Sequence, residues 1–357
     1  MLALNTTAIA WVILVVILLG WITYYFLNSA SARSELGSER ELAPNRKEYY
    51  DDDALEGRRL ERMQLLGVLL LATLVIGLPV YWILEPGRQA GATEGKANRF
   101  VSWGEQLFQT TANGGFNCAG CHGGLKGAGG QAPYAVTDPK TGEVKAVNWY
   151  APALNTVFYR FSKEEVRFIL NYGRPFSPMS AWGAPGGGPM TEQNIETLLA
   201  YLESIQIEPE GCTTERFPKN ADPYICEGGT LPKDTKAEIQ KSIDAYLKAN
   251  PGASEGEAIF NLDLASGAYS CARCHTQGWS YGDPGVTAQG GMGWNLTGGA
   301  TNSHFPNEAD MISFIKAGSV FGKKYGQQGQ GSGRMPGFGH LLTDEQIKAV
   351  VEYVRGL

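Results

Sequence analysis

One short pattern of cysteine and histidine occurs twice in this sequence. Residues 118–122 read Cys-Ala-Gly-Cys-His, and residues 271–275 read Cys-Ala-Arg-Cys-His. Two thiols one helical turn apart, followed directly by histidine, form the attachment signature of c-type haem. The thiols bond to the porphyrin, and the imidazole binds the iron from the proximal side. The sequence therefore predicts two covalently bound haem c groups, each with its iron, attached through Cys118, Cys121, Cys271 and Cys274 and ligated by His122 and His275.

Two other uses of cysteine and histidine compete with haem attachment. A thioredoxin-like dithiol needs a surrounding βαβ pattern, which this sequence does not contain. A structural zinc site needs four ligands, and glycine rather than further ligands surrounds each motif. The 46 glycines are about twice the average share, which suits a chain that passes close to a flat macrocycle.

Each motif is followed, about sixty residues later, by a methionine that can bind iron from the distal side. Met179 and Met335 occupy equivalent places, because each precedes a small residue and then an aromatic-glycine pair. Met190 is a rival for the first iron, but it directly precedes a helix cap and fits a hydrophobic staple. Its equivalent in the second half is Leu342, which cannot bind iron. We therefore predict that Met179 and Met335 are the distal ligands.

Three other residues could bind the second iron. Met292 lies too far before the final helix to be favoured. His304 lies in a predicted loop, and His340 lies five residues beyond Met335. Because Met335 already occupies the expected place, we interpret both histidines as exposed or propionate-facing.

The elements that position these ligands repeat in the same order in both halves. In residues 100–206 we expect a first helix over 103–116, a helix that begins with the capping box Ser162–Glu165, and a last helix after Thr191. Residues 256–357 repeat this plan with helices over 307–317 and 343–354. After the first motif we expect loop over residues 123–138. We call residues 100–206 the first repeat and residues 256–357 the second repeat.

Pro152 follows the first motif where the chain returns over the proximal face. Its carbonyl could accept the Nδ1–H of His122 and orient the ring, as groups behind metal-bound histidines do. It could equally be an ordinary turn proline. The second repeat has no proline at the corresponding place.

Two uncharged apolar runs precede the repeats, over residues 8–27 and 65–84, and each is long enough to span a bilayer. No basic residue precedes the first run, which argues against a signal peptide. Seven Lys and Arg residues lie between the runs, so the positive-inside tendency places loop 28–64 in the cytoplasm and both chain ends outside. Haem attachment on the exported side requires the same topology. We therefore predict a multi-pass protein of the cell membrane, with the haem domains on the extracytoplasmic side.

The remaining segments contain few residues that could take part in a reaction or bind a cofactor. The second apolar run ends in Glu-Pro-Gly at residues 85–87, which predicts the end of its helix, so residues 88–99 are interpreted as a tether. Residues 207–255 form an insertion with a helix predicted over 235–249. In this insertion Cys212 and Cys226 could form a disulfide in an oxidising compartment or remain two free thiols. A net charge of −6 argues against nucleic acid as a partner.

On these residues, each repeat resembles a class I cytochrome c domain. The whole arrangement, a membrane hairpin over residues 1–87 followed by two such domains, resembles the dihaem subunit of cbb-type cytochrome oxidases. It also resembles the membrane-anchored cytochrome c subunit of actinobacterial quinol–cytochrome c reductases. The resemblance implies an all-α fold, with an N-terminal transmembrane helix hairpin and two tandem class I cytochrome c domains.

Histidine and methionine together saturate the iron, which favours electron transfer over catalysis. We therefore expect no independent catalytic site. The predicted function is to carry electrons as a subunit of a respiratory complex, from quinol oxidation by a cytochrome b/Rieske-type reductase towards a terminal oxidase. The expected partners are the membrane subunits of that complex. A dihaem subunit of a cbb-type haem-copper oxidase and a free-standing membrane-anchored shuttle are the alternatives.

Overall fold

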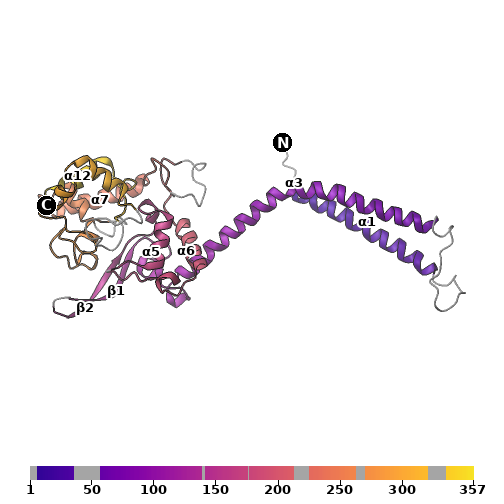
Figure 1. The fold of residues 1–357 in the computed structure, drawn as a ribbon, viewed down its shortest axis with the longest axis horizontal. Helices are drawn as coiled ribbons and strands as arrows, with labels where there is room; N and C mark the ends of the chain where they lie inside the picture. The colour runs from indigo at the N-terminus through magenta and orange to yellow at the C-terminus, as the bar shows by residue number, and fades with distance from the viewer. Residues whose placement is uncertain are drawn as a thin grey trace. The chain divides into compact units, whose positions relative to one another are not determined.

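The computed structural model describes residues 6–35, 57–138, 141–175, 177–212, 225–262, 270–320 and 335–357. It divides into two compact units, Met1–Lys96 and Ala97–Leu357. The second unit contains both haem motifs and is mostly helical (Figure 1).

The first unit consists of helix α1 (Thr6–Glu35) and most of helix α3 (Arg58–Phe108). Within the described residues, α3 is the one helix long and apolar enough to cross a membrane. Helix α1 contributes a shorter apolar segment, Trp11–Leu27. Many large apolar side chains of α1 and of the apolar part of α3 are exposed, as they would be toward lipid. Residues 36–56 of the predicted cytoplasmic loop lie outside the described residues.

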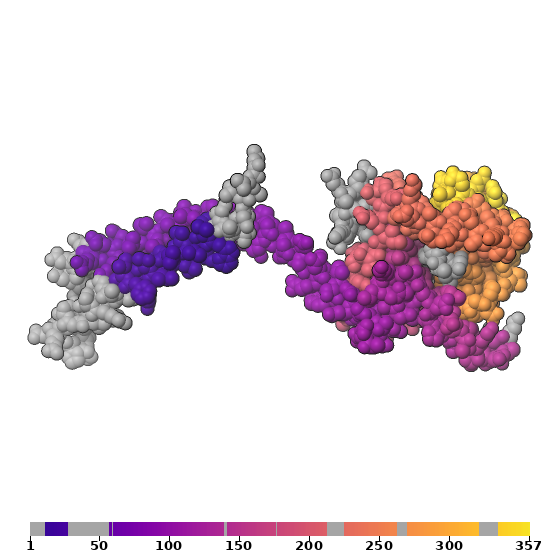
Figure 2. All heavy atoms as spheres, turned by 180° about the vertical axis from the view of Figure 1, so that it is seen from behind, coloured from indigo at the N-terminus to yellow at the C-terminus, as the bar shows by residue number. Residues whose placement is uncertain are grey.

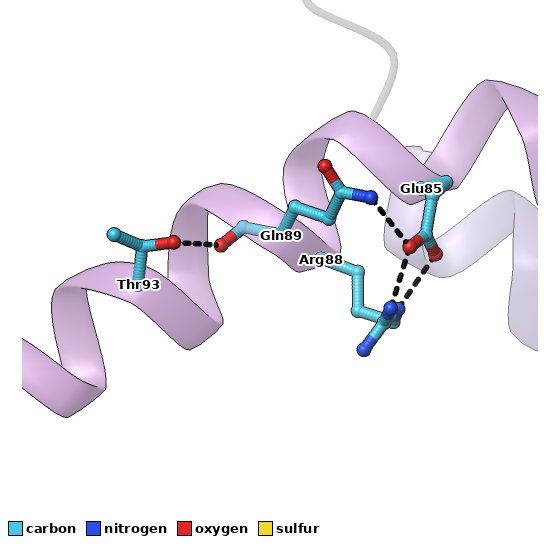
Figure 3. A network of polar contacts seen from close by, with 4 residues as sticks. All are labelled: Glu85, Arg88, Gln89 and Thr93. Atoms are coloured by element: carbon cyan, nitrogen blue, oxygen red, sulfur yellow. Dashed lines mark hydrogen bonds and ion pairs between the residues drawn. The ribbon is translucent and has the colours of Figure 1, made fainter.

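Helix α3 does not end at Glu85-Pro86-Gly87, and the predicted tether over 88–99 is helical. Proline removes one backbone hydrogen bond but does not forbid a helix whose neighbouring turns are held by other bonds. Figure 3 shows such bonds: Glu85 accepts from Arg88 Nε at 2.6 Å and from Gln89 Nε2 at 2.9 Å. One turn later, Thr93 Oγ1 donates to the Gln89 carbonyl at 2.9 Å. These contacts span the Pro-Gly pair and the turn that follows it.

The first repeat begins with the last turns of α3, which stop at Phe108 rather than at the predicted residue 116. The motif helix α4 (Cys118–His122), strands β1 (Gly130–Thr137) and β2 (Val144–Ala151), and helices α5 (Lys163–Tyr172) and α6 (Glu192–Ser204) follow. Ser162 and Glu165 form the predicted capping box of α5, and Thr191 forms one with Asn194 at α6. These helix starts are confirmed because they depend on local side-chain bonds.

The two strands are a departure from the predicted all-α fold. They pair antiparallel from Gly130↔Ala151 to Thr137↔Val144 (Figure 1). Strand β1 lies within residues 123–138, so the loop predicted there is wrong. The strands themselves contain aromatic and β-branched residues, which favour a pleated surface, and Tyr134 packs edge-on against Trp149 across the pair.

The insertion contains helix α7 (Lys233–Ala249), and it precedes the second repeat. Ile239 and Ile243 of α7 are buried in the core of that repeat, so the insertion is part of its structure. The second repeat consists of α8 (Glu255–Phe260), the motif helix α9 (Ala272–His275), α10 (Ala300–His304), α11 (Glu308–Ala317) and α12 (Asp344–Arg355). Thr343 and Gln346 form the predicted capping box of α12.

Each repeat is closed by two crossing helices that meet at a glycine. A Cβ atom at Gly104 would overlap the backbone oxygen of Thr197 in α6, and one at Gly256 would overlap that of Ala349 in α12. One turn later, Phe108 packs against Tyr201 with ring centroids 5.2 Å apart. Phe260 and Tyr353 repeat that contact at 5.6 Å. The same glycine-then-aromatic crossing therefore closes both repeats.

Candidate haem sites

Each haem motif lies on a single turn of helix. Helix α4 covers Cys118–His122, and α9 covers Ala272–His275 with Cys271 as its N-terminal cap. One helical turn separates the two cysteines of each motif, and the histidine follows directly. The structure thus gives both motifs the local geometry that attachment through two thioethers requires.

The proximal histidines are each oriented by a backbone carbonyl. His122 Nδ1 lies 2.8 Å from the Pro152 oxygen, which confirms the interpretation of Pro152 as an orienting residue. His275 Nδ1 lies 2.8 Å from the Trp294 oxygen, so tryptophan supplies the carbonyl where proline is missing. This bond fixes the tautomer in which Nε2 carries the lone pair that would bind an iron.

The environment keeps both imidazoles in the form that binds metal. Burial lowers the pKa of His122 and that of His275, while the carbonyl hydrogen bonds act in the opposite direction. A neutral imidazole has the free lone pair that coordination needs. The donor set and its surroundings therefore fit a haem iron.

Gly293 lies directly against the imidazole ring of His275, the proximal histidine of the second motif. A Cβ atom at this position would lie 2.8 Å from Cε1 and 3.0 Å from Nδ1 of His275. We expect Gly293→Ala to displace the imidazole, weakening the proximal bond and changing the visible spectrum and reduction potential of one haem of the two. The matched control is Gly285→Ala, because a Cβ there would meet only the Gln277 oxygen at 3.6 Å. Unchanged spectra and potentials in Gly293→Ala would contradict the placement of His275.

The structure does not support the redox-dithiol interpretation of the motifs. Burial raises the pKa of the Cys118 thiol to about 11 and that of the Cys271 thiol to about 12. Redox-active dithiols depend on a lowered thiol pKa, so the direction is opposite. Among the described residues no three His, Cys, Asp or Glu side chains are grouped as a metal-ion site.

Met179 and Met335 occupy the same place in the two repeats. Helix α5 ends at Gly173 and α11 ends at Gly318, both with positive φ. A Cβ atom at Gly173 would lie 2.5 Å from the Met179 oxygen, and one at Gly318 would lie 2.5 Å from the Met335 oxygen. The backbone of each methionine therefore packs against the glycine that caps the end of the preceding helix. Both methionine side chains are partly buried against the core of their repeat.

Met190 has a different environment. Its side chain is 1 % exposed and belongs to the same buried cluster as Ile195, as a hydrophobic staple requires. Its backbone nitrogen donates to the Trp182 oxygen at 2.8 Å. Met190 therefore packs as a core residue, which favours Met179 as the sulfur ligand.

Other singled-out residues connect the insertion to the second repeat. His340 Nδ1 lies 2.7 Å from the Gly229 oxygen, and the His340 oxygen accepts from Leu231. Cys212 and Cys226 are joined by a disulfide, with Cα atoms 5.9 Å apart. His304 ends α10 and contacts the ring of Phe305.

Comparison with known families agrees with this geometry. Residues 101–206 match the family model described as Cytochrome c, and residues 251–354 match the one described as Cytochrome C oxidase, cbb3-type, subunit III. The chain is a dihaem c-type cytochrome. Its two domains bind two haem c groups through the cysteine pairs at 118/121 and 271/274, and it is an electron carrier. No curated protein and no solved structure matches this cytochrome.

Proposed function

We propose that this dihaem cytochrome is a membrane-anchored subunit of a respiratory complex that carries electrons from quinol oxidation towards a terminal oxidase. The observation that carries the proposal is that the same arrangement of candidate iron ligands occurs in both repeats. Each repeat has a proximal histidine fixed by a carbonyl and a methionine segment packed against a helix-ending glycine. Two equivalent electron-transfer sites on one chain suit stepwise conduction.

The chain's own residues set the conditions for that transfer. Bound haem supplies a one-electron couple, and histidine–methionine ligation raises its potential relative to ligation by two histidines. His122 and His275 would hold the iron from one side, and Met179 and Met335 from the other. Ligation by one histidine and one methionine at each iron would leave no coordination site for oxygen or peroxide. The cysteine thioethers fix each macrocycle to its domain.

The membrane arrangement of this proposal has two spans. Helix α3 supplies one, and the apolar segment of α1 would supply the other. Loop 28–64 would lie in the cytoplasm, and both haem domains would lie outside, where haem is attached. Two spans exceed what a simple tether needs, which supports contacts with partner subunits within the membrane.

The match of residues 251–354 favours a second candidate. That family is described as a subunit of a cbb3-type oxidase, so this chain could serve in a haem-copper oxidase itself. The two candidates share the electron-transfer chemistry and differ in the partner. A cytochrome b with a Rieske protein would identify the reductase, and a haem-copper catalytic subunit would identify the oxidase.

Gentle detergent extraction of the native membrane tests the proposal. We expect the chain to co-purify in a large assembly with b-type haem and a Rieske iron–sulfur signal. A haem-copper spectrum instead would establish the second candidate. Recovery of the chain as a lone species would contradict both and leave a free-standing shuttle.

Carbon monoxide provides the matching test on the isolated chain. Because both axial positions are expected to be filled, the reduced cytochrome should not bind carbon monoxide. The measurement is the difference spectrum of the reduced protein with and without the gas. Binding at one haem would reveal an open iron and point to a catalytic role such as peroxide reduction.

A further inference from the structure

Arg273 belongs to the second haem motif but reaches the first repeat. Its side chain is 4 % exposed, and its Nη1 donates to the Tyr150 oxygen in β2 at 2.5 Å. Its guanidinium carbon lies 5.7 Å from the ring centroid of Trp279, over the ring face. A buried cation is costly unless a carbonyl or an aromatic face compensates it, and this one has both.

The carbonyl that Arg273 binds lies next to the proximal support of the first haem. Tyr150 is two residues before Pro152, whose own oxygen holds His122. A short run of backbone, 150–152, therefore connects the guanidinium of one motif to the imidazole of the other. The contact crosses from the second repeat to the first.

The β1–β2 hairpin holds this connection in place. Trp149 packs against Tyr281 of the second repeat with ring centroids 5.3 Å apart, and Lys145 Nζ lies 2.5 Å from Asp283 Oδ2. The hairpin and the second repeat lie against each other in Figure 2. The Lys145–Asp283 pair is exposed, so its field is screened by water, whereas the Arg273 charge is not.

The geometry places the Arg273 charge close to the proximal side of the first site. Its guanidinium is bonded to the Tyr150 oxygen, and the Pro152 oxygen two residues later is bonded to His122. A buried positive charge beside an iron ligand would disfavour the ferric state of that iron, because oxidation adds positive charge.

We propose that Arg273 is a positioning residue of the first haem, which raises the reduction potential of that haem across the domain boundary and fixes the strand that supports His122. A single residue of the second attachment motif thus supports the proximal side of the first haem. The proposal rests on His122 as the proximal ligand and is independent of which complex contains the chain.

The test compares three variants of the purified full chain by optical redox titration. Arg273→Met should lower the potential of the first haem and change its ratio of oxidised to reduced form by about tenfold, equivalent to 59 mV for one electron. Arg273→Lys keeps the charge and should keep most of the native potential. Lys145→Met removes an exposed charge from the same interface and should shift neither haem.

A Met335→His background assigns the two potentials, because a second haem ligated by two histidines titrates lower and leaves the first haem as the higher component. Arg273→Gln retains an amide donor for the Tyr150 oxygen and replaces the methionine variant if that variant loses haem. An unchanged first haem in the neutral variants would overturn the proposal. An equal fall in the potential of the first haem in Arg273→Lys and Arg273→Met would also overturn it, because the effect would then not depend on the charge.

Discussion

Replacing Met179 with alanine is expected to open the first iron to external ligands. The variant should lose half of the weak near-infrared sulfur-to-iron absorption, because one of two haems loses its thioether. Its reduced form should bind carbon monoxide at one haem per chain. The potential of that haem should also fall, since methionine favours the ferrous state relative to water or nitrogen ligands. Difference spectroscopy and redox titration measure all three effects.

The matched control for this experiment is supplied by the chain itself. Met190→Leu reproduces the residue that the second repeat has at the equivalent place, Leu342. A swap of similar volume in a core costs less than about 1.5 kcal/mol, so the domain should stay folded. The near-infrared band should survive in Met190→Leu. Loss of the band there, with retention in Met179→Ala, would assign the ligand to Met190.

The features that could be predicted from sequence depend on neighbours along the chain. The capping boxes at Ser162 and Thr343 satisfy amides within their own first turn, so their residue types are sufficient to predict them. The glycine crossings could be predicted for a related reason. A glycine four residues before an aromatic residue occurs in both repeats, and the second copy makes the first significant.

The features that sequence reasoning missed depend on contacts between distant segments. Strand β1 lies where loop is predicted, and its partner β2 obtains part of its packing from Tyr281, more than a hundred residues away. The role of the Trp294 carbonyl has no side-chain signature, since any residue type can present a backbone oxygen. The only signal was the missing proline, which showed that a substitute was needed but not which residue supplied it.

The continuation of α3 through Pro86 shows a second limit. Proline followed by glycine ordinarily marks a helix end, and on this basis a tether is predicted over residues 88–99. Other contacts can outweigh this local preference, and here Glu85 bonds to two side chains of the following turn, those of Arg88 and Gln89. The residues of the predicted tether therefore form an exposed part of α3.

Substituting alanine for the two crossing glycines should unfold the repeats one at a time. In an exposed helix Gly→Ala stabilises by up to about 1 kcal/mol. At Gly256 the sign should reverse, because the added methyl would overlap the Ala349 oxygen and approach Cβ of Tyr353 at 2.8 Å. Backbone on both sides cannot move without separating α8 from α12, so we expect a loss at the upper end of overpacking, about 3 kcal/mol.

Gly104→Ala makes the corresponding change at Thr197 and Tyr201 of the first repeat, so each variant is the control for the other. Denaturant titration followed at the haem absorption should show one early transition in each variant, carrying half of the haem signal. Gly95→Ala, in the exposed part of α3 with no atom within 4 Å of the added carbon, should leave both transitions in place. If both repeats unfold together in either variant, their interface rather than the helix crossing sets the stability of the haem unit. The contacts of Arg273 and Trp149 would then hold the two domains as one cooperative body.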